Sequence, residues 1–202
     1  MKNKRLNSQG QKTKIRLVQA AIECLAEHGL HNTSFQTIAD KCGLARPLVA
    51  YHFQEKSQIF TKVWDFIYEE ALRKTESKLK VSGSAKEKIL NYMRVSIEIF
   101  SEKKEVTFVY FQLHYMSAFN SDIRQKNTEI KRRAVNRIAV IIMAGQKSNE
   151  FKAELDPYLV AKMIHSSLIG ILINSITEFE DFTLKDVLIT FEEQILISLI
   201  RQ

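Results

Sequence analysis

The stretch Thr33–Phe60, TSFQTIADKCGLARPLVAYHFQEKSQIF, predicts two short helices joined by a tight turn, with a third helix beginning behind them. Thr33 can cap the first helix, and Gln36, three residues later, can complete a capping box. Gly43 then supplies the left-handed residue that commonly ends a helix. Pro47 fits only a first helical turn, because its ring lacks an amide hydrogen, so the second helix begins just before it. Helix, short glycine turn and helix is a geometry with which proteins read DNA.

The same stretch resembles the TetR-type (tetracycline-repressor-like) bacterial transcription regulators. The resemblance is carried by residues at fixed spacing, namely Thr33, Ile38, Ala39, Gly43, Leu44, Pro47, Tyr51, His52, Phe53, Lys56 and Phe60. Two positions depart from the family's pattern: Ala45 stands where a serine cap is common, and Ala50 where an aromatic residue is usual. These departures concern the operator sequence and not the mode of binding.

The resemblance also implies which side chains meet DNA. It places Gln36, Arg46, Pro47, Leu48 and Ala50 toward the bases, and Tyr51, His52 and Lys56 on phosphates. From the residues themselves, Arg46 can make the bidentate contact to guanine that is the commonest specific pairing, although a phosphate contact or a solvated arginine is also possible. Hydroxyls of Thr33 or Ser34 at a helix start can donate to a phosphate, although an ordinary cap explains the same residues.

The composition indicates a soluble, nearly all-helical protein. Two prolines and six glycines interrupt 202 residues, of which 45% are hydrophobic and 26% are charged. The basic amino terminus is not followed by the apolar segment of a signal peptide. The longest apolar run, 163–176, contains polar residues and is too short to cross a bilayer, so we expect a cytoplasmic protein with no membrane partner.

The formal charge of +7 is concentrated at the amino-terminal end. Residues 1–60 hold nine Lys and Arg against four Asp and Glu, a balance of +5, which leaves +2 for residues 61–202. A basic segment of this kind suits contacts to DNA phosphates. Considered alone, without the neighbouring motif, the same segment is better explained as a solvated, disordered tail that keeps the protein soluble.

The helix signals predict an all-α fold of about nine helices in two domains. A three-helix DNA-binding domain with the helix-turn-helix occupies residues 1–55, with a basic tail at 1–10, and a helical ligand-binding and dimerisation domain occupies 56–202. The helix over 56–80 connects them. The helices are predicted at 13–28, 34–42, 46–53, 56–80, 85–101, 104–117, 122–148, 157–178 and 184–201.

The last two predicted helices carry more apolar surface than a monomeric bundle needs. Stripes at helical spacing consist of Leu159, Met163, Ser167 and Gly170 in one helix and Leu184, Leu188, Phe191, Ile195 and Leu199 in the other. A two-fold dimer through a four-helix interface, which the resemblance also implies, would bury them. Two central helices of a monomer are the alternative. In the dimer, two recognition helices would face half-sites about 34–36 Å apart.

A ligand pocket is expected among the middle helices. Its candidate residues are polar or aromatic side chains set among apolar ones: Tyr92, Ser96, Phe111, His114, Tyr115, His165 and Asn174. Each is also explained as an ordinary core or surface residue. An apolar pocket with a few polar anchors suits a hydrophobic or amphipathic small molecule. The basic run at 131–137 reads as a solvated face or as a receiver of an anion.

Metal, cofactor and catalytic signals are missing from the sequence. The five histidines lack zinc-ligand spacing, and Cys24 and Cys42 read as reduced thiols, with a redox sensor as the alternative. We therefore predict no metal, no cofactor and no enzyme. The predicted function is a homodimeric transcription regulator, a repressor released from a palindromic operator by a small effector. The alternative is a DNA-bound helical scaffold that docks a protein partner without sensing a small molecule.

Overall fold

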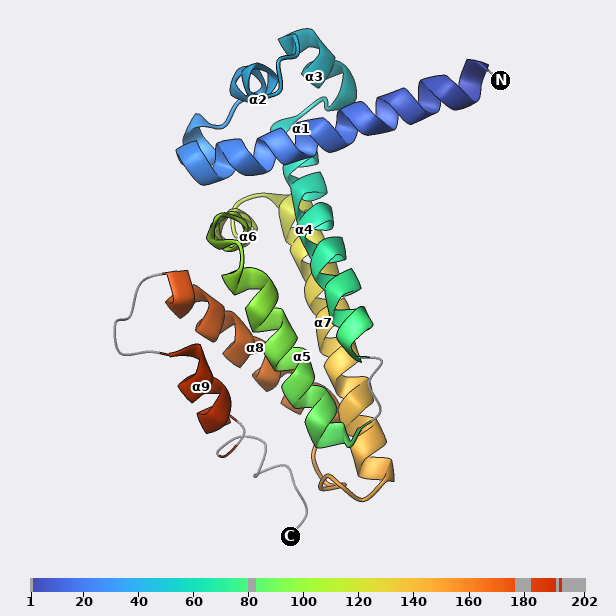
Figure 1. Ribbon diagram of the computed structural model, residues 1–202, viewed down its shortest axis with the longest axis vertical. Coiled ribbons are helices and arrows are strands. Elements are labelled where there is room, and N and C mark those ends of the chain that lie inside the picture. Colours follow the sequence, from blue (N-terminus) through green and yellow to red (C-terminus); the bar gives the residue numbers. More distant parts are fainter. Residues whose placement is uncertain (1, 80–82, 177–182, 192, 194–202) are drawn as a thin grey trace. The chain divides into compact units, whose positions relative to one another are not determined.

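The computed structural model describes residues 2–79, 83–176, 183–191 and 193, and these residues form nine α-helices (Figure 1). Their bounds are α1 Lys2–Asn32, α2 Phe35–Lys41, α3 Arg46–His52, α4 Lys56–Leu79, α5 Ala85–Ser101, α6 Lys104–Met116, α7 Ser121–Lys147, α8 Pro157–Ile176 and α9 Leu184–Thr190. The predicted all-α fold is confirmed for the described residues.

Helix α1 begins much earlier than the sequence analysis predicted. It starts at Lys2, so the predicted basic tail is helical, because the segment before Thr13 holds no proline and a single interior glycine costs only about 1 kcal/mol. At the other end Gly29 has φ 71° and ψ −178°, which interrupts the helix at the predicted stop. This left-handed φ favours glycine, the one residue without a Cβ.

The cap of α2 lies one residue later than predicted. Ser34 has the extended backbone of a cap (φ −132°, ψ 168°), and its hydroxyl accepts from the Thr37 amide at 3.1 Å. The Thr37 hydroxyl in turn accepts from the Ser34 amide at 2.8 Å, which completes a capping box. Thr33 is fully buried and donates to the Gly29 carbonyl at 2.7 Å. The predicted cap at Thr33 with Gln36 was therefore wrong.

The described chain divides into two compact units that do not follow chain order. The first comprises Met1–Glu69 and Phe108–Asn127, and the second comprises Glu70–Thr107 and Thr128–Gln202. Helices α4, α6 and α7 each contribute residues to both units. The domain boundary after residue 55 stays a prediction from the sequence.

The core of the first unit fixes the three amino-terminal helices on α4. Its fully buried side chains include Leu17, Ala21 and Leu25 of α1, Ile38 and Ala39 of α2, Val49 of α3, and Ile59, Val63 and Trp64 of α4. The Gln112 amide of α6 donates to the Leu25 carbonyl of α1 at 2.9 Å. Val49 is the buried residue of the short helix α3, and the exposed residues of this helix stay available.

The second unit packs α5 against α8 around an aliphatic core. Fully or almost fully buried members include Ile89, Met93 and Ile97 of α5, Ile138 and Ile142 of α7, and Ile164, Leu168 and Leu172 of α8. Glu150, in the connection between α7 and α8, accepts from the amides of Ala85 and Lys86, both at 2.8 Å. Its carboxylate thereby caps the start of α5, and its negative charge interacts favourably with the positive amino-terminal end of the helix dipole.

Candidate nucleic-acid interface and ligand site

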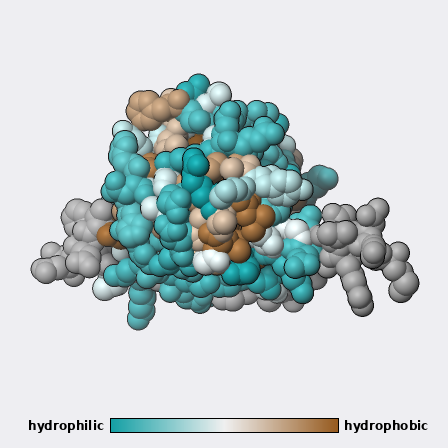
Figure 2. Space-filling model, turned by 90° about the horizontal axis from the view of Figure 1, so that it is seen from above, coloured by the Kyte–Doolittle hydropathy of each residue, from teal (hydrophilic) through white to brown (hydrophobic). Residues whose placement is uncertain are grey.

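Helix α3 turns its predicted base-reading residues outward. Arg46, Pro47 and Ala50 are exposed, and Tyr51 is 81% exposed, while Val49 on the opposite face is fully buried. Arg46 makes no hydrogen bond or ion pair within the part of the chain that the structure describes. Figure 2 turns the view of Figure 1 by 90° and shows a largely hydrophilic face with scattered apolar patches.

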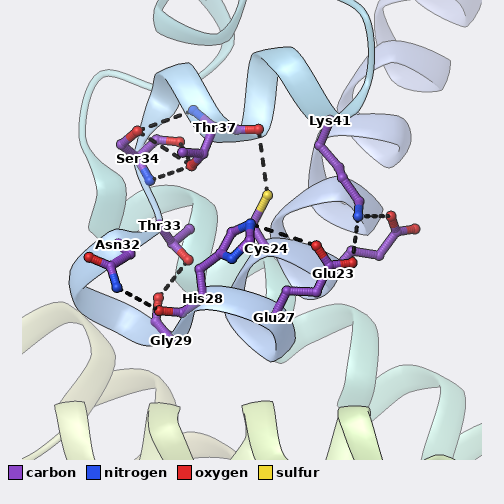
Figure 3. A network of polar contacts seen from close by, with 10 residues as sticks. All are labelled: Glu23, Cys24, Glu27, His28, Gly29, Asn32, Thr33, Ser34, Thr37 and Lys41. Carbon is purple, nitrogen blue, oxygen red and sulfur yellow. Dashed lines mark hydrogen bonds and ion pairs between the residues drawn. The ribbon is translucent and has the colours of Figure 1, made fainter.

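A network of polar contacts holds α2 on α1 and thereby positions α3 (Figure 3). Lys41 of α2 pairs with Glu27 of α1 at 2.5 Å and with Glu23 at 3.7 Å. The Arg16 guanidinium donates to the Cys42 carbonyl at 2.9 Å, just beyond the end of α2. Because the two helices are joined at both polar and apolar contacts, the unit can present α3 in one fixed orientation.

Lys14 of α1 acts electrostatically on His52, a predicted phosphate contact at the end of α3. Burial lowers the pKa of His52, and the charge of Lys14 lowers it further. Lys14 is itself exposed, and the rings of Tyr51 and His52 meet edge to face at 5.3 Å between centroids. His52 is therefore neutral at pH 7 in the free protein and can donate one N–H to a phosphate.

Three predicted DNA contacts are engaged inside the chain. Thr33 does not fit the prediction, because its side chain is fully buried and its hydroxyl binds Gly29. The Lys56 ammonium donates to the Leu30 carbonyl at 3.2 Å and burial lowers its pKa, so it would have to leave that carbonyl to reach a phosphate. The Gln36 amide donates to the Asp40 carboxylate at 2.7 Å, although Gln36 remains exposed.

The seven predicted pocket residues are divided between the two units. Phe111, His114 and Tyr115 belong to the first unit, and Tyr92, Ser96, His165 and Asn174 belong to the second. Tyr115 is 65% exposed, which does not fit a residue that lines an enclosed pocket. A ligand enclosed by the second unit would meet only the latter four.

In the first unit, a polar and aromatic cluster includes two residues that sequence reasoning missed as site candidates. Trp64 is fully buried, and its ring meets that of His114 at 5.3 Å. The Asn127 amide donates to the Ser117 hydroxyl at 2.9 Å. Trp64 Nε1 and Asn127 Oδ1 are buried without a hydrogen-bond partner. The signal for Asn127 was available, because it interrupts the apolar stripe of α7 at helical spacing.

In the second unit, His165 of α8 has an unusual environment. Both ring nitrogens are buried and lack a hydrogen-bond partner among the described residues. Burial, together with the charges of Lys131 and Arg137 on α7, lowers the pKa of His165 to about 4. On α5, Tyr92 and Ser96 are also buried, at 5% and 8% exposure. The interior of this unit is thus apolar with a few polar side chains.

One face of α8 exposes apolar side chains at helical spacing, with small residues between them. Leu159 is 57% exposed and Met163 is 68% exposed, and Ile173 lies further along the same helix at 44%. Gly170 has open space beside it, and the Ser167 hydroxyl is satisfied by the Met163 carbonyl at 3.0 Å. By length and composition α8 could also cross a membrane, a test that core helices of soluble proteins pass as well.

The predicted interface residues of the final helix behave differently. Phe191 is 4% exposed within its own chain, so the prediction that it faces a partner does not fit. Leu188 is half-buried. The side chain of Leu184, and residues Ile195 and Leu199, lie outside what the structure describes.

The described residues contain no group of three or more histidine, cysteine or acidic side chains that could hold a metal ion. Both cysteines are free thiols, and burial is the main cause that raises the pKa of each. Among these residues we therefore find no support for a redox role of Cys24 or Cys42.

Two family models account for nearly all of the chain. Residues 17–63 match the model of bacterial regulatory proteins of the tetR family, and residues 67–198 match a tetR-type model that describes the C-terminal region of YsiA-like proteins. The chain belongs to the tetR family. The helix-turn-helix geometry of α2 and α3 is therefore that of a DNA-binding transcriptional regulator, as predicted.

Several known regulators resemble this chain over most of its length. The fatty acid metabolism regulator protein of Bacillus subtilis is 26% identical over 154 residues, which cover 76% of this chain and 78% of that protein. FadR of B. subtilis in complex with stearoyl-CoA superposes with a TM-score of 0.78 at 22% identity, covering 92% of this chain and 97% of that one. A transcriptional regulator from Saccharomonospora viridis in complex with choline superposes with a TM-score of 0.81 at 20% identity, covering 95% of this chain and 100% of that one. None of these relatives indicates an enzymatic activity.

Proposed function

We propose that this tetR-family regulator is a homodimeric, cytoplasmic repressor that leaves a palindromic operator when an amphipathic ligand with an apolar chain binds in the second unit. The observation that carries the DNA-binding part is the outward face of α3, where Arg46 is exposed and its side chain makes no hydrogen bond or ion pair among the described residues. An arginine held ready in this way can contact a guanine without first breaking an internal bond. A repressor of this kind acts by occupying its operator.

The proposed contacts to DNA follow from exposure and charge. Base contacts are assigned to Arg46, Pro47, Leu48 and Ala50, with Gln36 able to join them if its amide turns away from Asp40. Phosphate contacts are assigned to Ser34, Tyr51 and His52, with Lys14 beside His52, while Lys56 contributes only if it is released from Leu30. Phosphate contacts fix the register of the protein, and base contacts supply the sequence preference.

The exposed stripe of α8 supports the homodimer. Leu159 and Met163 are mostly exposed in the single chain, and Ser167 and Gly170 continue the stripe with small residues that permit close helix approach. Burying apolar surface of this kind is favourable at about 25 cal/mol per Å². A second copy of the chain related by a two-fold axis would bury the same stripe twice.

The class of ligand is proposed from the interior of the second unit and from the relatives. Its core consists mainly of isoleucine, leucine, valine and methionine side chains, with buried Tyr92 and Ser96 among them. A protein 26% identical to this one is a fatty acid metabolism regulator, and a structural neighbour holds stearoyl-CoA. Another neighbour, at 20% identity, holds choline. We favour a ligand with an aliphatic chain, because such a chain suits an aliphatic interior.

Release of the operator requires only that ligand and DNA prefer different conformations of the same dimer. Helix α4 is continuous from Lys56 to Leu79 and contributes to both units. A ligand that shifts the distal part of α4 would change the separation of the two recognition helices. By linkage, a ligand that weakens DNA binding tenfold must itself bind tenfold more weakly to the DNA-bound protein.

The proposal is tested by selecting binding sites from a randomised duplex pool and then titrating the recovered duplex with ligand. We expect an inverted repeat with half-sites about one helical turn apart, about 34–36 Å. Dodecanoyl-CoA or dodecanoate should then release the duplex. Sequence-blind binding alone would contradict the regulator model, and tight ligand binding without any change in operator affinity would contradict ligand-controlled release.

A second candidate function is the DNA-bound scaffold that docks a protein partner. It is favoured by an exposed aromatic pair in the first unit: Tyr115 is 65% and Phe119 is 74% exposed, and their ring centroids lie 5.1 Å apart. Aromatic residues on a surface are enriched at protein interfaces. Substituting both residues with serine would abolish partner capture by a scaffold and would leave ligand-controlled release by a repressor unchanged.

A further inference from the structure

The interior of the second unit contains a polar group that the fold itself does not satisfy. Both nitrogens of the His165 imidazole are buried, and neither has a hydrogen-bond partner among the described residues. His165 lies on the same side of α8 as Ala161 and Leu168, which are buried, and not on the side of exposed Met163. Leaving a buried donor and acceptor unpaired is costly, and a native protein that does so commonly uses the group for binding or catalysis.

Helix α7 carries two cations, Lys131 and Arg137, whose charges act on this imidazole. The Tyr158 hydroxyl of α8 meets the Asn136 amide oxygen of α7 at 3.4 Å. This contact shows that the two helices approach each other at that point. Lys131 and Arg137 flank the buried stripe of α7 that contains Ala134 and Ile138.

The charges around His165 are of one sign. Lys131 and Arg137 are the charged groups that act on it from α7, and no carboxylate acts on it within the described structure. Glu129, the nearby acid of α7, pairs with Arg133 at 2.8 Å. From α5 the buried polar groups of this unit are the hydroxyls of Tyr92 and Ser96. A neutral imidazole that can donate one N–H beside two cations is complementary to an anion.

We propose that His165, Lys131 and Arg137 form the subsite for the anionic head group of an amphipathic ligand whose aliphatic chain enters the core of the second unit. This inference rests on the proposed function and makes its ligand more specific. The imidazole N–H donates to the anion, while the ammonium and guanidinium groups supply the charge. The anion is the carboxylate of a free fatty acid or a phosphate of an acyl-CoA, since both present charged oxygens next to an acyl chain.

The test compares full-length wild type with His165→Phe, which keeps a ring of similar size and removes both nitrogens. Binding is measured by titration calorimetry with dodecanoate, dodecanoyl-CoA, coenzyme A and the uncharged dodecanol. The Kd of the anionic probe should rise about tenfold or more in the variant, whereas that of dodecanol should stay within about twofold. The melting temperature should be unchanged or higher, because two unpaired buried atoms are removed.

Charge is tested separately with Arg137→Gln and Lys131→Gln, and the matched control is Lys162→Gln on the exposed side of α8. The first two substitutions should weaken the binding of dodecanoate or dodecanoyl-CoA, and the control substitution should not. Preference for dodecanoate identifies a carboxylate, and preference for dodecanoyl-CoA identifies the phosphates. Three outcomes would overturn the subsite. His165→Phe could weaken the binding of dodecanol and of the anionic probes equally, or it could lower the melting temperature and leave binding unchanged. The third outcome is that wild type binds none of the four probes. Operator release by the bound probe is scored separately and decides the proposed function alone.

Discussion

Replacing Arg46 should separate DNA binding from folding more cleanly than any other change in α3. Arg46 is the first residue of the helix, is exposed and has no internal partner among the described residues. A cation at a helix amino terminus opposes the helix dipole by roughly 0.3–1 kcal/mol. Arg46→Ala should therefore leave the free energy of unfolding unchanged or raise it by roughly 0.3 kcal/mol, because a good helix former replaces an unfavourably placed charge.

The same substitution should cost much of the operator affinity. A bidentate arginine contact to guanine contributes about 1–3 kcal/mol, which corresponds to about 5- to 150-fold in Kd for each half-site. In a dimer the loss occurs twice, so the total is about 2–6 kcal/mol when the half-sites contribute additively. The sequence preference at one base pair of each half-site should relax at the same time.

The assay is fluorescence anisotropy with the selected operator and with a scrambled duplex of equal length, combined with urea unfolding. Arg46→Lys is the matched control, since it keeps the charge but cannot form the planar two-point contact. It should retain most of the scrambled-duplex affinity and lose the preference for operator. Unchanged operator affinity in Arg46→Ala would refute the assignment, and a parallel loss of folding stability would show that the residue supports α3 and does not read DNA.

Four further substitutions test other parts of the structure. Lys14→Ala should raise the pKa of His52 toward its ordinary value, since one of the two causes that lower it is removed, and an NMR titration checks this. The same substitution should reduce the slope of log affinity against log salt concentration by about one for each half-site, which anisotropy measures. Glu150→Ala should lower the free energy of unfolding by about 2–4 kcal/mol in urea titrations, because two amides at the start of α5 lose a charged acceptor, and Glu150→Gln should lose about half as much. Gly43→Ala should cost about 1–2 kcal/mol through its φ of 62° alone, since no atom lies within 4 Å of the added methyl group, and a thermal melt that matches wild type would contradict this. His165 has a folded pKa of about 4, below its ordinary 6.5, so the stability from its neutral ring is present above pH 6.5 and is lost as the pH falls toward 4; His165→Phe should remove roughly 3 kcal/mol of this pH dependence from unfolding curves.

The helices were predictable from the sequence because their ends carry local chemical signals. The capping box of Ser84 and Glu87 marks the start of α5, and the left-handed Gly43 ends the first helix of the motif as predicted. Where two adjacent residues can both act as a cap, as at Thr33 and Ser34, only the packing of the preceding turn decides. There the buried hydroxyl of Thr33 is taken by the Gly29 carbonyl, and a pattern search cannot see that bond.

The candidate sites differ in the same way: those that depend on local periodicity could be predicted from the sequence, and those that depend on contacts between distant helices could not. The outward residues of α3 follow from helical periodicity, which places Val49 inward and Ala50 outward. The pocket residues depend on which distant helices meet, and the sequence grouped Tyr115 with Tyr92 although one is exposed in the first unit and the other is buried in the second. The unpaired nitrogens of His165 could not be inferred from sequence, because an absent partner is a property of the folded interior.

The exposed stripe on α8 has a consequence for how operator occupancy depends on the amount of this protein in the cell. If a repressor must pair with a second copy before it grips both half-sites, operator occupancy at low concentration rises with the square of the number of chains. A twofold fall in synthesis would then cut occupancy about fourfold in that regime. Leu159 and Met163 would thus set a threshold for gene silencing, and a single polar substitution in the stripe would shift that threshold without touching either DNA or effector.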